Sequence, residues 1–220
     1  MYKRELSFII NYLDNKEIKI NECKPENCYN LSKLDISQIT NLENLFRSSL
    51  INDICSMNEI SSHDCNISKW DVSNVTNMSY MFYKAKYFNQ NLNNWDISKV
   101  TNLSNMFSYA NNFNKPLNNW NTSKVIDMKG MFAETKVFNQ NIGNWNLDNI
   151  INCDFMFDKA KTFLDKYNSG KPLPNKTEDI KEWFNLNRER MNDIDLKDKY
   201  GEEIDMFFNK FTDINSINKI

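Results

Sequence analysis

The sequence predicts an α/β repeat solenoid with helical caps, in which each coil of 25 residues holds one short strand and one short helix. The first observation is a strict repeat, whose four copies begin at Trp70, Trp95, Trp120 and Trp145. Repeats of this length are typical of stacked coils, because one unit cannot bury its own apolar face and is stabilised by its neighbours. The second observation is a set of apolar columns with the same interval: Val75, Val100, Val125 and Ile150; Met81, Met106, Met131 and Met156; Phe82, Phe107, Phe132 and Phe157; and Phe88, Phe113, Phe138 and Phe163.

Each copy contains two successive patterns. The alternation at Trp95 and Ile97 predicts a short strand with both side chains inward. A helix is predicted next, with Ser98 and Thr101 placed to cap its free amides. Its apolar face consists of Val100, Leu103, Met106, Phe107 and Ala110. We expect the strands of successive coils to form a narrow parallel sheet.

Asparagine is the commonest turn-forming residue of this chain. The sequence has 38 Asn but only 4 Gly and 4 Pro, so Asn must supply much of the turn chemistry. Two Asn columns follow the repeat, Asn89, Asn114 and Asn139, and Asn94, Asn119 and Asn144. We predict that these amides bond the backbone of adjacent coils and have a structural role.

Four segments are expected along the chain. Residues 1–33 form an N-terminal cap, with a helix over residues 5–13 and a short strand over residues 17–20. Residues 34–69 form a degenerate first repeat, because Leu34 stands where later copies have Trp. Leu34 and Trp70 are 36 residues apart, so about 11 residues are inserted between Ser49 and Cys65. This insert is either a loop of a binding surface or neutral drift in a tolerated loop.

The remaining two segments are residues 70–167, with the four regular repeats, and residues 168–220, a helical C-terminal cap. Two amphipathic helices are expected in the cap. Their apolar faces are Ile180, Trp183, Phe184 and Met191, and Ile204, Phe207, Phe208 and Phe211. We expect both helices to cover the last coil, since exposed aromatic faces are unfavourable. An interaction arm or an oligomerisation element is the alternative.

Composition limits the classes of partner. A net charge of −2 with both signs interspersed predicts neither nucleic-acid binding nor attraction to an anionic membrane. No apolar run is long enough for an integral membrane segment. The apolar run from Leu6 to Ile10 is broken by Asn11 and Asp14, so we expect a helix there and no signal peptide.

The five cysteines indicate no disulfide framework, because their spacing is irregular. Cys153 falls in the column of Met78, Leu103 and Met128, which predicts a small buried core residue. The others are Cys23, Cys28, Cys55 and Cys65. Unpaired thiols or one local disulfide are expected there, and a zinc site that includes His63 is the weaker alternative.

No residue is identified as catalytic, and the sequence predicts neither a cofactor nor a metal. His63 is the single histidine, and a partner as near in sequence as Cys65 rarely gives the geometry of a nucleophilic triad. Gly residues are too scattered for a phosphate-binding loop. A convergent pair of carboxylates is not excluded by the sequence, but nothing points to one. We therefore expect a binding protein rather than an enzyme.

The predicted contact surface is the outward row of the strand pattern. If the Trp side chains face inward, the row consists of Asp71, Ser73, Asp96, Ser98, Asn121, Ser123, Asn146 and Asp148. Capping and backbone hydrogen bonding are the alternative role at each single position. The repeat thus predicts a protein partner without identifying it.

The unit Trp70-Asp-Val-Ser-Asn-Val-Thr-Asn-Met-Ser-Tyr-Met-Phe82, followed by Ala85 and Phe88-Asn-Gln-Asn-Leu92, resembles the BspA-like leucine-rich repeat surface proteins. The likeness covers about residues 34–163. It implies a solenoid of the leucine-rich-repeat kind, usually displayed at a cell surface or secreted. It also implies a role in adhesion, with extracellular matrix or a host receptor as partner, and brings no catalytic residues. An intracellular, cytoplasmic scaffold or regulator that binds a protein is the alternative.

Overall fold

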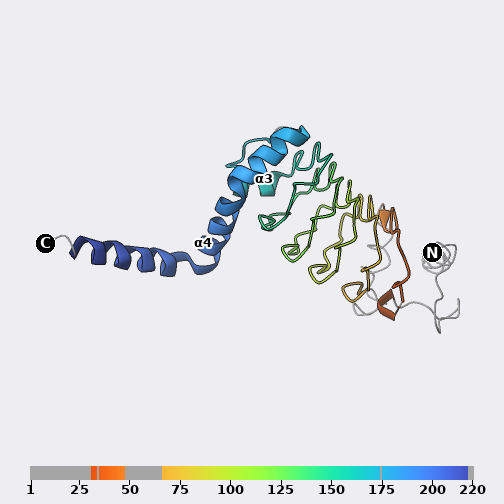
Figure 1. Ribbon diagram of the computed structural model, residues 1–220, viewed down its shortest axis with the longest axis horizontal. Helices are drawn as coiled ribbons and strands as arrows, with labels where there is room; N and C mark the ends of the chain where they lie inside the picture. Colours follow the sequence, from red (N-terminus) through yellow and green to blue (C-terminus); the bar gives the residue numbers. More distant parts are fainter. Residues whose placement is uncertain (1–30, 34, 48–65, 174, 218–220) are drawn as a thin grey trace.

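The computed structural model describes residues 31–33, 35–47, 66–173 and 175–217. The predicted N-terminal helix and strand, the insert, and the four cysteines with His63 lie outside these residues. A short 3-10 helix, η1, spans Leu31–Lys33. Two α-helices follow the repeats, α3 at Lys161–Tyr167 and α4 at Thr177–Ile217. Residues 35–47 and 66–160 form a row of stacked coils (Figure 1).

The core of the stack is a set of apolar columns that run through all coils. The Phe82, Phe107 and Phe132 rings are fully buried and stack on one another with centroids 5.6 and 5.8 Å apart. A second column stacks beside it, since Phe113 lies 4.0 Å from Phe107 and 6.0 Å from Phe138. The aromatic columns expected from the sequence are therefore formed as packed, offset rings, an arrangement that favours aromatic pairs.

The predicted fold class is wrong. Within the described residues the coils hold no strand and no α-helix, and the pairing between coils is limited to isolated parallel bridges. These bridges join Asn41 to Asn77, Asn77 to Asn102, Asn102 to Asp127 and Asp127 to Asn152. The chain is therefore not an α/β solenoid with one strand and one helix per coil.

The hydrogen-bond pattern explains why neither element forms. In residues 80–85 alternate N–H groups donate to different partners: every second one to a carbonyl of the next coil, and those between them to the carbonyl three residues earlier. Tyr80 N thus donates to Ser104 O at 2.9 Å, whereas Met81 N donates to Met78 O at 3.2 Å. A helix would need every amide for its own turns and a strand would need a continuous ladder.

Left-handed backbone at two positions of each regular repeat also excludes the predicted helix. The first column has φ of 57° at Tyr80, 54° at Asn105, 58° at Gly130 and 60° at Phe155. The second has φ of 59° at Lys84, 60° at Tyr109, 59° at Glu134 and 54° at Lys159. Left-handed residues cannot continue a right-handed helix. Ser98 and Thr101 consequently cap no helix, and Thr101 Oγ1 donates instead to Thr76 O of the preceding coil at 3.2 Å.

The buried residues mimic a helical pattern because turns with bonds between residues three apart return a side chain inward about every third position. Val100, Leu103, Met106, Phe107 and Ala110 are all fully buried, as the sequence predicts. The inward direction of Trp95 and Ile97 is also confirmed, with exposed fractions of 3% and 1%. The periodicity thus identified the core but not the backbone conformation.

The first Asn column has the predicted structural role. Asn89 Oδ1 accepts the N–H of Asn114 at 3.0 Å, and Asn114 Oδ1 accepts the N–H of Asn139 at 3.0 Å. Each amide therefore joins two adjacent coils. A further column was not anticipated: Asn77, Asn102, Asp127 and Asn152, the bridge residues, each accept the N–H two residues later.

The first coil aligns with the second despite the longer spacing. Asn41 is bridged to Asn77, and the Phe46 and Phe82 rings stack with centroids 5.6 Å apart. Both pairs are separated by 36 residues in the sequence. Residues 35–47 therefore form a coil of the same kind as the regular repeats.

The last coil is covered by α4 and by the turn that precedes it. Phe155 N donates to Asn175 O at 3.0 Å, and Cys153 N donates to Thr177 Oγ1 at 2.9 Å. These acceptors take the place of a further coil. Asp154 Oδ1 accepts the N–H of Thr177 at 2.8 Å, which fixes the start of α4 on the coil.

The N-terminal part of α4 packs on the core, and its C-terminal part extends away from the coils (Figure 1). Ile180, Phe184 and Met191 are buried, with exposed fractions of at most 1%. The structure has one continuous helix here, where the sequence predicted two. Cys153 is free and fully buried, which confirms its predicted place in the core.

Candidate functional site

The eight residues of the predicted contact row form four identical turns on successive coils. In each turn the first side chain accepts the backbone N–H of the second residue through Oδ1. The distances are 3.0 Å for Asp71 and Ser73, 3.0 Å for Asp96 and Ser98, 3.1 Å for Asn121 and Ser123, and 2.7 Å for Asn146 and Asp148. The serines are half-buried and the other five residues are exposed. The row is therefore both a set of turn caps and a polar surface.

The carboxylates of Asp71 and Asp96 in this row are held in their ionised form. Hydrogen bonds from the side chain and then the backbone of Ser73 lower the pKa of Asp71. Ser98 lowers the pKa of Asp96 in the same way. Asp35 on the first coil makes the same turn with Ser37 and has a lowered pKa, mainly through the backbone N–H of Ser37. The row thus extends one coil further than the sequence indicated, with aspartates on its first three coils and, through Asp148, on its last coil.

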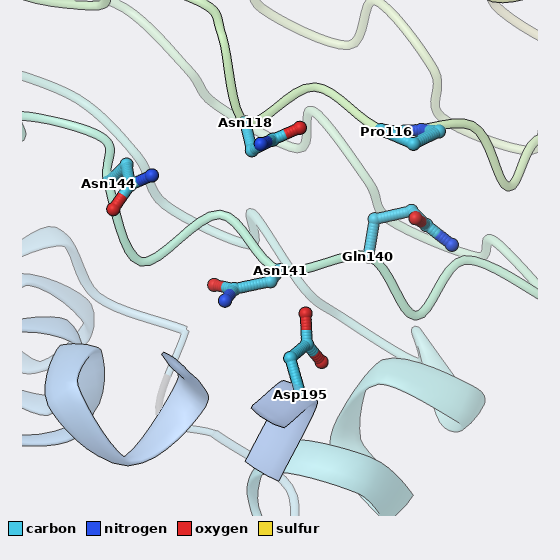
Figure 2. Close-up of a pocket in the computed structure, with 6 residues that line it drawn as sticks. All are labelled: Pro116, Asn118, Gln140, Asn141, Asn144 and Asp195. Atoms are coloured by element: carbon cyan, nitrogen blue, oxygen red, sulfur yellow. The ribbon is translucent and has the colours of Figure 1, made fainter. Parts of the chain in front are cut away.

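The structure also forms a polar pocket that was not predicted (Figure 2). It has a volume of about 220 Å³ and is lined by Pro116, Asn118, Gln140, Asn141, Asn144 and Asp195. The first five belong to two successive coils and Asp195 belongs to α4. Figure 2 shows the Asp195 carboxylate pointing toward Gln140 and Asn141. The docking of α4 on the coils brings Asp195 to the five coil residues.

Asp195 is positioned by two neighbours from α3. Its Oδ1 accepts hydrogen bonds from Tyr167 Oη at 2.8 Å and from Lys166 Nζ at 2.7 Å. Burial, followed by the bond to Asp195, raises the pKa of Tyr167, so its hydroxyl stays protonated. Burial alone would lower the pKa of Lys166, but its bonds to Asp195 and Asp198 outweigh burial and raise it. Asp195 is therefore a fixed hydrogen-bond acceptor at one wall of the pocket.

Two amides of the pocket donate hydrogen bonds to asparagine side chains outside its lining. Gln140 Nε2 donates to Asn114 Oδ1 at 2.7 Å, and Asn141 Nδ2 donates to Asn192 Oδ1 at 2.8 Å. The lining therefore suits water or a small hydroxyl-bearing molecule better than an apolar ligand. The Asn column that includes Asn119 and Asn144 was the only signal in the sequence, and it did not reveal the contribution of α4.

A second unpredicted group is the tyrosine–cation cluster, which consists of Arg47, Tyr80, Tyr83, Lys84 and Tyr109. The Arg47 guanidinium lies 5.2 Å from the Tyr80 ring centroid and 5.0 Å from that of Tyr83. Lys84 Nζ lies 5.1 Å from the centroid of Tyr83 and 5.7 Å from that of Tyr109. The cluster is not visible in the sequence, because its members come from three coils and follow no repeat column of one residue type.

In the residues that the structure describes, no group of three or more His, Cys, Asp or Glu side chains could hold a metal ion. None of the helices described is long and apolar enough to cross a membrane. The zinc alternative involves residues that lie outside the structure's described ranges.

The stacked coils show that this chain is a repeat protein. Its polar rows form an extended surface along the coils. Residues 52–170, more than half of the chain, match the sequence model of the family described as Mycoplasma protein of unknown function, DUF285. The chain therefore belongs to this family. No curated protein and no solved structure matches it.

Proposed function

We propose that this chain is a non-catalytic, protein-binding repeat protein that acts in adhesion or host interaction at the cell surface. The resemblance of the repeat unit to BspA-like surface proteins supports this assignment. The observation that carries it is the exposed row: Asp71, Asp96, Asn121 and Asn146 present equivalent side chains on four successive coils. A partner that lies along the coils would meet these groups at regular intervals.

The test of the row uses one triple variant and one matched control. Asp71→Lys, Asp96→Lys and Asn146→Lys together replace exposed acceptors with cations. Binding to immobilised extracellular-matrix proteins, with collagen, laminin and fibronectin as probes, is measured at moderate salt by biolayer interferometry. We expect a loss of about tenfold or more in affinity for the matrix protein that the wild type binds, since like charges across an interface are strongly unfavourable.

The control variant carries Asn94→Lys, Asn119→Lys and Asn144→Lys. These three side chains are exposed and have the same 25-residue interval, so the control adds three cations at another position of the repeat. It raises the net charge by three, whereas the row variant raises it by five because two of its changes also remove a carboxylate. Equal affinities of wild type and row variant for the bound matrix protein would remove the row from the proposal. Equal losses in both triple variants would show a nonspecific effect of charge.

Location is tested separately. Antibodies against the chain are applied to intact and to permeabilised source cells. Labelling of intact cells supports adhesion. Labelling only after permeabilisation overturns the surface role and leaves the intracellular scaffold or regulator as the function to pursue.

A further inference from the structure

The tyrosine–cation cluster extends over the first three coils. It alternates rings and cations in the order Tyr80, Arg47, Tyr83, Lys84 and Tyr109, with the centroids of Tyr80 and Tyr83 5.5 Å apart and those of Tyr83 and Tyr109 5.9 Å apart. Both ring pairs are edge-to-face. Arg47 and Lys84 are exposed, and Tyr109 is 40% exposed. The cluster is thus a continuous surface reached by solvent.

The cations of the cluster have no carboxylate partner within the described residues. Arg47 donates to Asn44 Oδ1 at 3.0 Å, and the ion pairs of the structure join other side chains. The turns that carry the cluster contain one carboxylate, that of Glu43, which accepts hydrogen bonds from Asn44 Nδ2 at 3.2 Å and from Asn77 Nδ2 at 3.3 Å. Beyond them, Glu134 is paired with Lys159 at 2.6 Å. The cluster and its turns therefore carry two cations against one carboxylate, in a protein whose net charge is −2.

Backbone geometry keeps this surface in place. Tyr80, Lys84 and Tyr109 all have left-handed φ, between 57° and 60°. Their N–H groups donate to the following coil at 2.8–2.9 Å, while the adjacent Met81 and Phe82 are fully buried. The rings and cations are consequently held on a rigid support, which reduces the entropy that binding would cost.

We infer that the tyrosine–cation cluster is a docking site for an acidic segment of a partner protein that also carries an aromatic or apolar residue. Tyr and Arg are enriched where proteins bind tightly, because they supply large contact areas and charged hydrogen bonds. Carboxylates of the segment would pair with Arg47 and Lys84, and its apolar residue would pack on the exposed Tyr109 ring. This inference rests on the proposed protein-binding function and adds the chemistry of the partner.

The probe is a fluorescent 12-residue peptide rich in Asp and Glu with one Phe, and anisotropy is measured at about 50 and about 300 mM salt. A peptide with Asn and Gln at the acidic positions is the control ligand. We expect the acidic peptide to bind at least about tenfold more tightly than the neutral one at low salt, with the difference reduced at high salt. Equal binding of the two peptides would overturn the inference.

The cluster itself is tested with Arg47→Gln combined with Lys84→Gln. The matched variant carries Lys99→Gln and Lys124→Gln, which remove two exposed cations from another part of the coils. Only the first variant should lose about tenfold in peptide affinity. Tyr109→Ala, which changes no charge, should weaken binding of the acidic peptide to a smaller extent. Near-ultraviolet circular dichroism checks that each variant is folded.

Two further results would reject the inference. Peptide affinity that is lost equally in both charge variants would indicate general electrostatics. Heparin or single-stranded DNA that binds the cluster much more tightly than the peptide would assign it to another class of polyanion. If a matrix protein binds through the Asp71 row while the peptide fails, the proposed function stands and only this inference falls.

Discussion

Trp120 Nε1 donates a hydrogen bond to the carbonyl oxygen of Leu92 on the preceding coil, 2.9 Å away. Both residues are buried, so the bond satisfies a carbonyl that water does not reach. The same bond recurs from Trp70 to Leu31, from Trp95 to Ile67 and from Trp145 to Leu117, at 2.8, 3.1 and 2.9 Å. The tryptophan that marks each repeat in the sequence thus both fills the core and links two coils.

Replacing Trp120 by Phe should destabilise the protein by at least about 1–3 kcal/mol. The variant leaves the buried Leu92 carbonyl without its donor, and the smaller ring adds a loss of packing. Urea unfolding followed by circular dichroism measures the change. Tyr87→Phe, at a side chain that is 56% exposed, is the control and should be close to neutral. Similar midpoints for wild type and Trp120→Phe would contradict the role of this bond.

Replacing Phe107 by Ala should cost about 3–5 kcal/mol of unfolding free energy, because the ring is fully buried and the cavity lies in the middle of the stack. Phe107 contacts Phe82, Phe113 and Phe132 at centroid distances of 5.6, 4.0 and 5.8 Å. The matched control is Phe155→Ala, since that ring is 42% exposed. A thermal melt of Phe107→Ala that coincides with the wild-type melt would show that the ring column is not a core.

The turn carboxylates should make stability depend on acidic pH. The pKa values of Asp71 and Asp96 are lowered in the folded protein, so their contribution is present above the ordinary pKa of 3.8 and is lost as the pH falls through the lowered values. Asn keeps the Oδ1 acceptor without titrating, as Asn121 and Asn146 do in the same turn. The Asp71→Asn, Asp96→Asn variant should therefore lose less stability below about pH 4.

Melting temperatures of the wild type and this double variant, measured from pH 7 to pH 2, test the prediction. The two curves should diverge only on the acidic side, with the wild type falling further. Parallel curves over the whole range would mean that hydrogen bonding in these turns does not depend on ionisation of the carboxylates.

The Cys153 thiol should be unreactive in the folded protein. It is fully buried, and burial raises its pKa to about 11, so almost no thiolate is present at pH 8. Alkylation with iodoacetamide, followed by mass spectrometry of the peptide that contains Cys153, should show modification in urea and very little without it. Rapid modification under native conditions would indicate that the last coil opens readily.

Most of the buried core residues could be predicted from the sequence. Trp95, Ile97, Met106 and Phe107 are inward because each apolar column repeats every 25 residues, and stacking requires equivalent positions to meet. The Asn column of Asn89 was predictable for the same reason. The predicted helix and strand were wrong because inward spacing alone does not distinguish a helix from a series of turns. The residues whose left-handed φ excludes a helix include Tyr80 and Lys84, and no propensity rule predicts that conformation for them.

Of the candidate surfaces, one could be predicted from the sequence and one could not. The Asp71 row was visible because it repeats with the coils, although its role as turn caps emerged from the hydrogen bonds with Ser73 and its equivalents. The pocket beside Asp195 was not visible, because Asp195 lies more than 50 residues beyond the coil residues that line the pocket with it. The BspA-like resemblance and the binding role stay predictions.

By itself the sequence determined the interval of the repeat, the inward columns and the contacts between equivalent residues, since all of these follow from periodicity. Only the tertiary structure decided the backbone of each coil, the docking of α4 and the grouping of Arg47 with Tyr80, Tyr83, Lys84 and Tyr109. The physical reason is that these features depend on how N–H groups are shared between adjacent coils, and on which non-repeating side chains the stacking brings together.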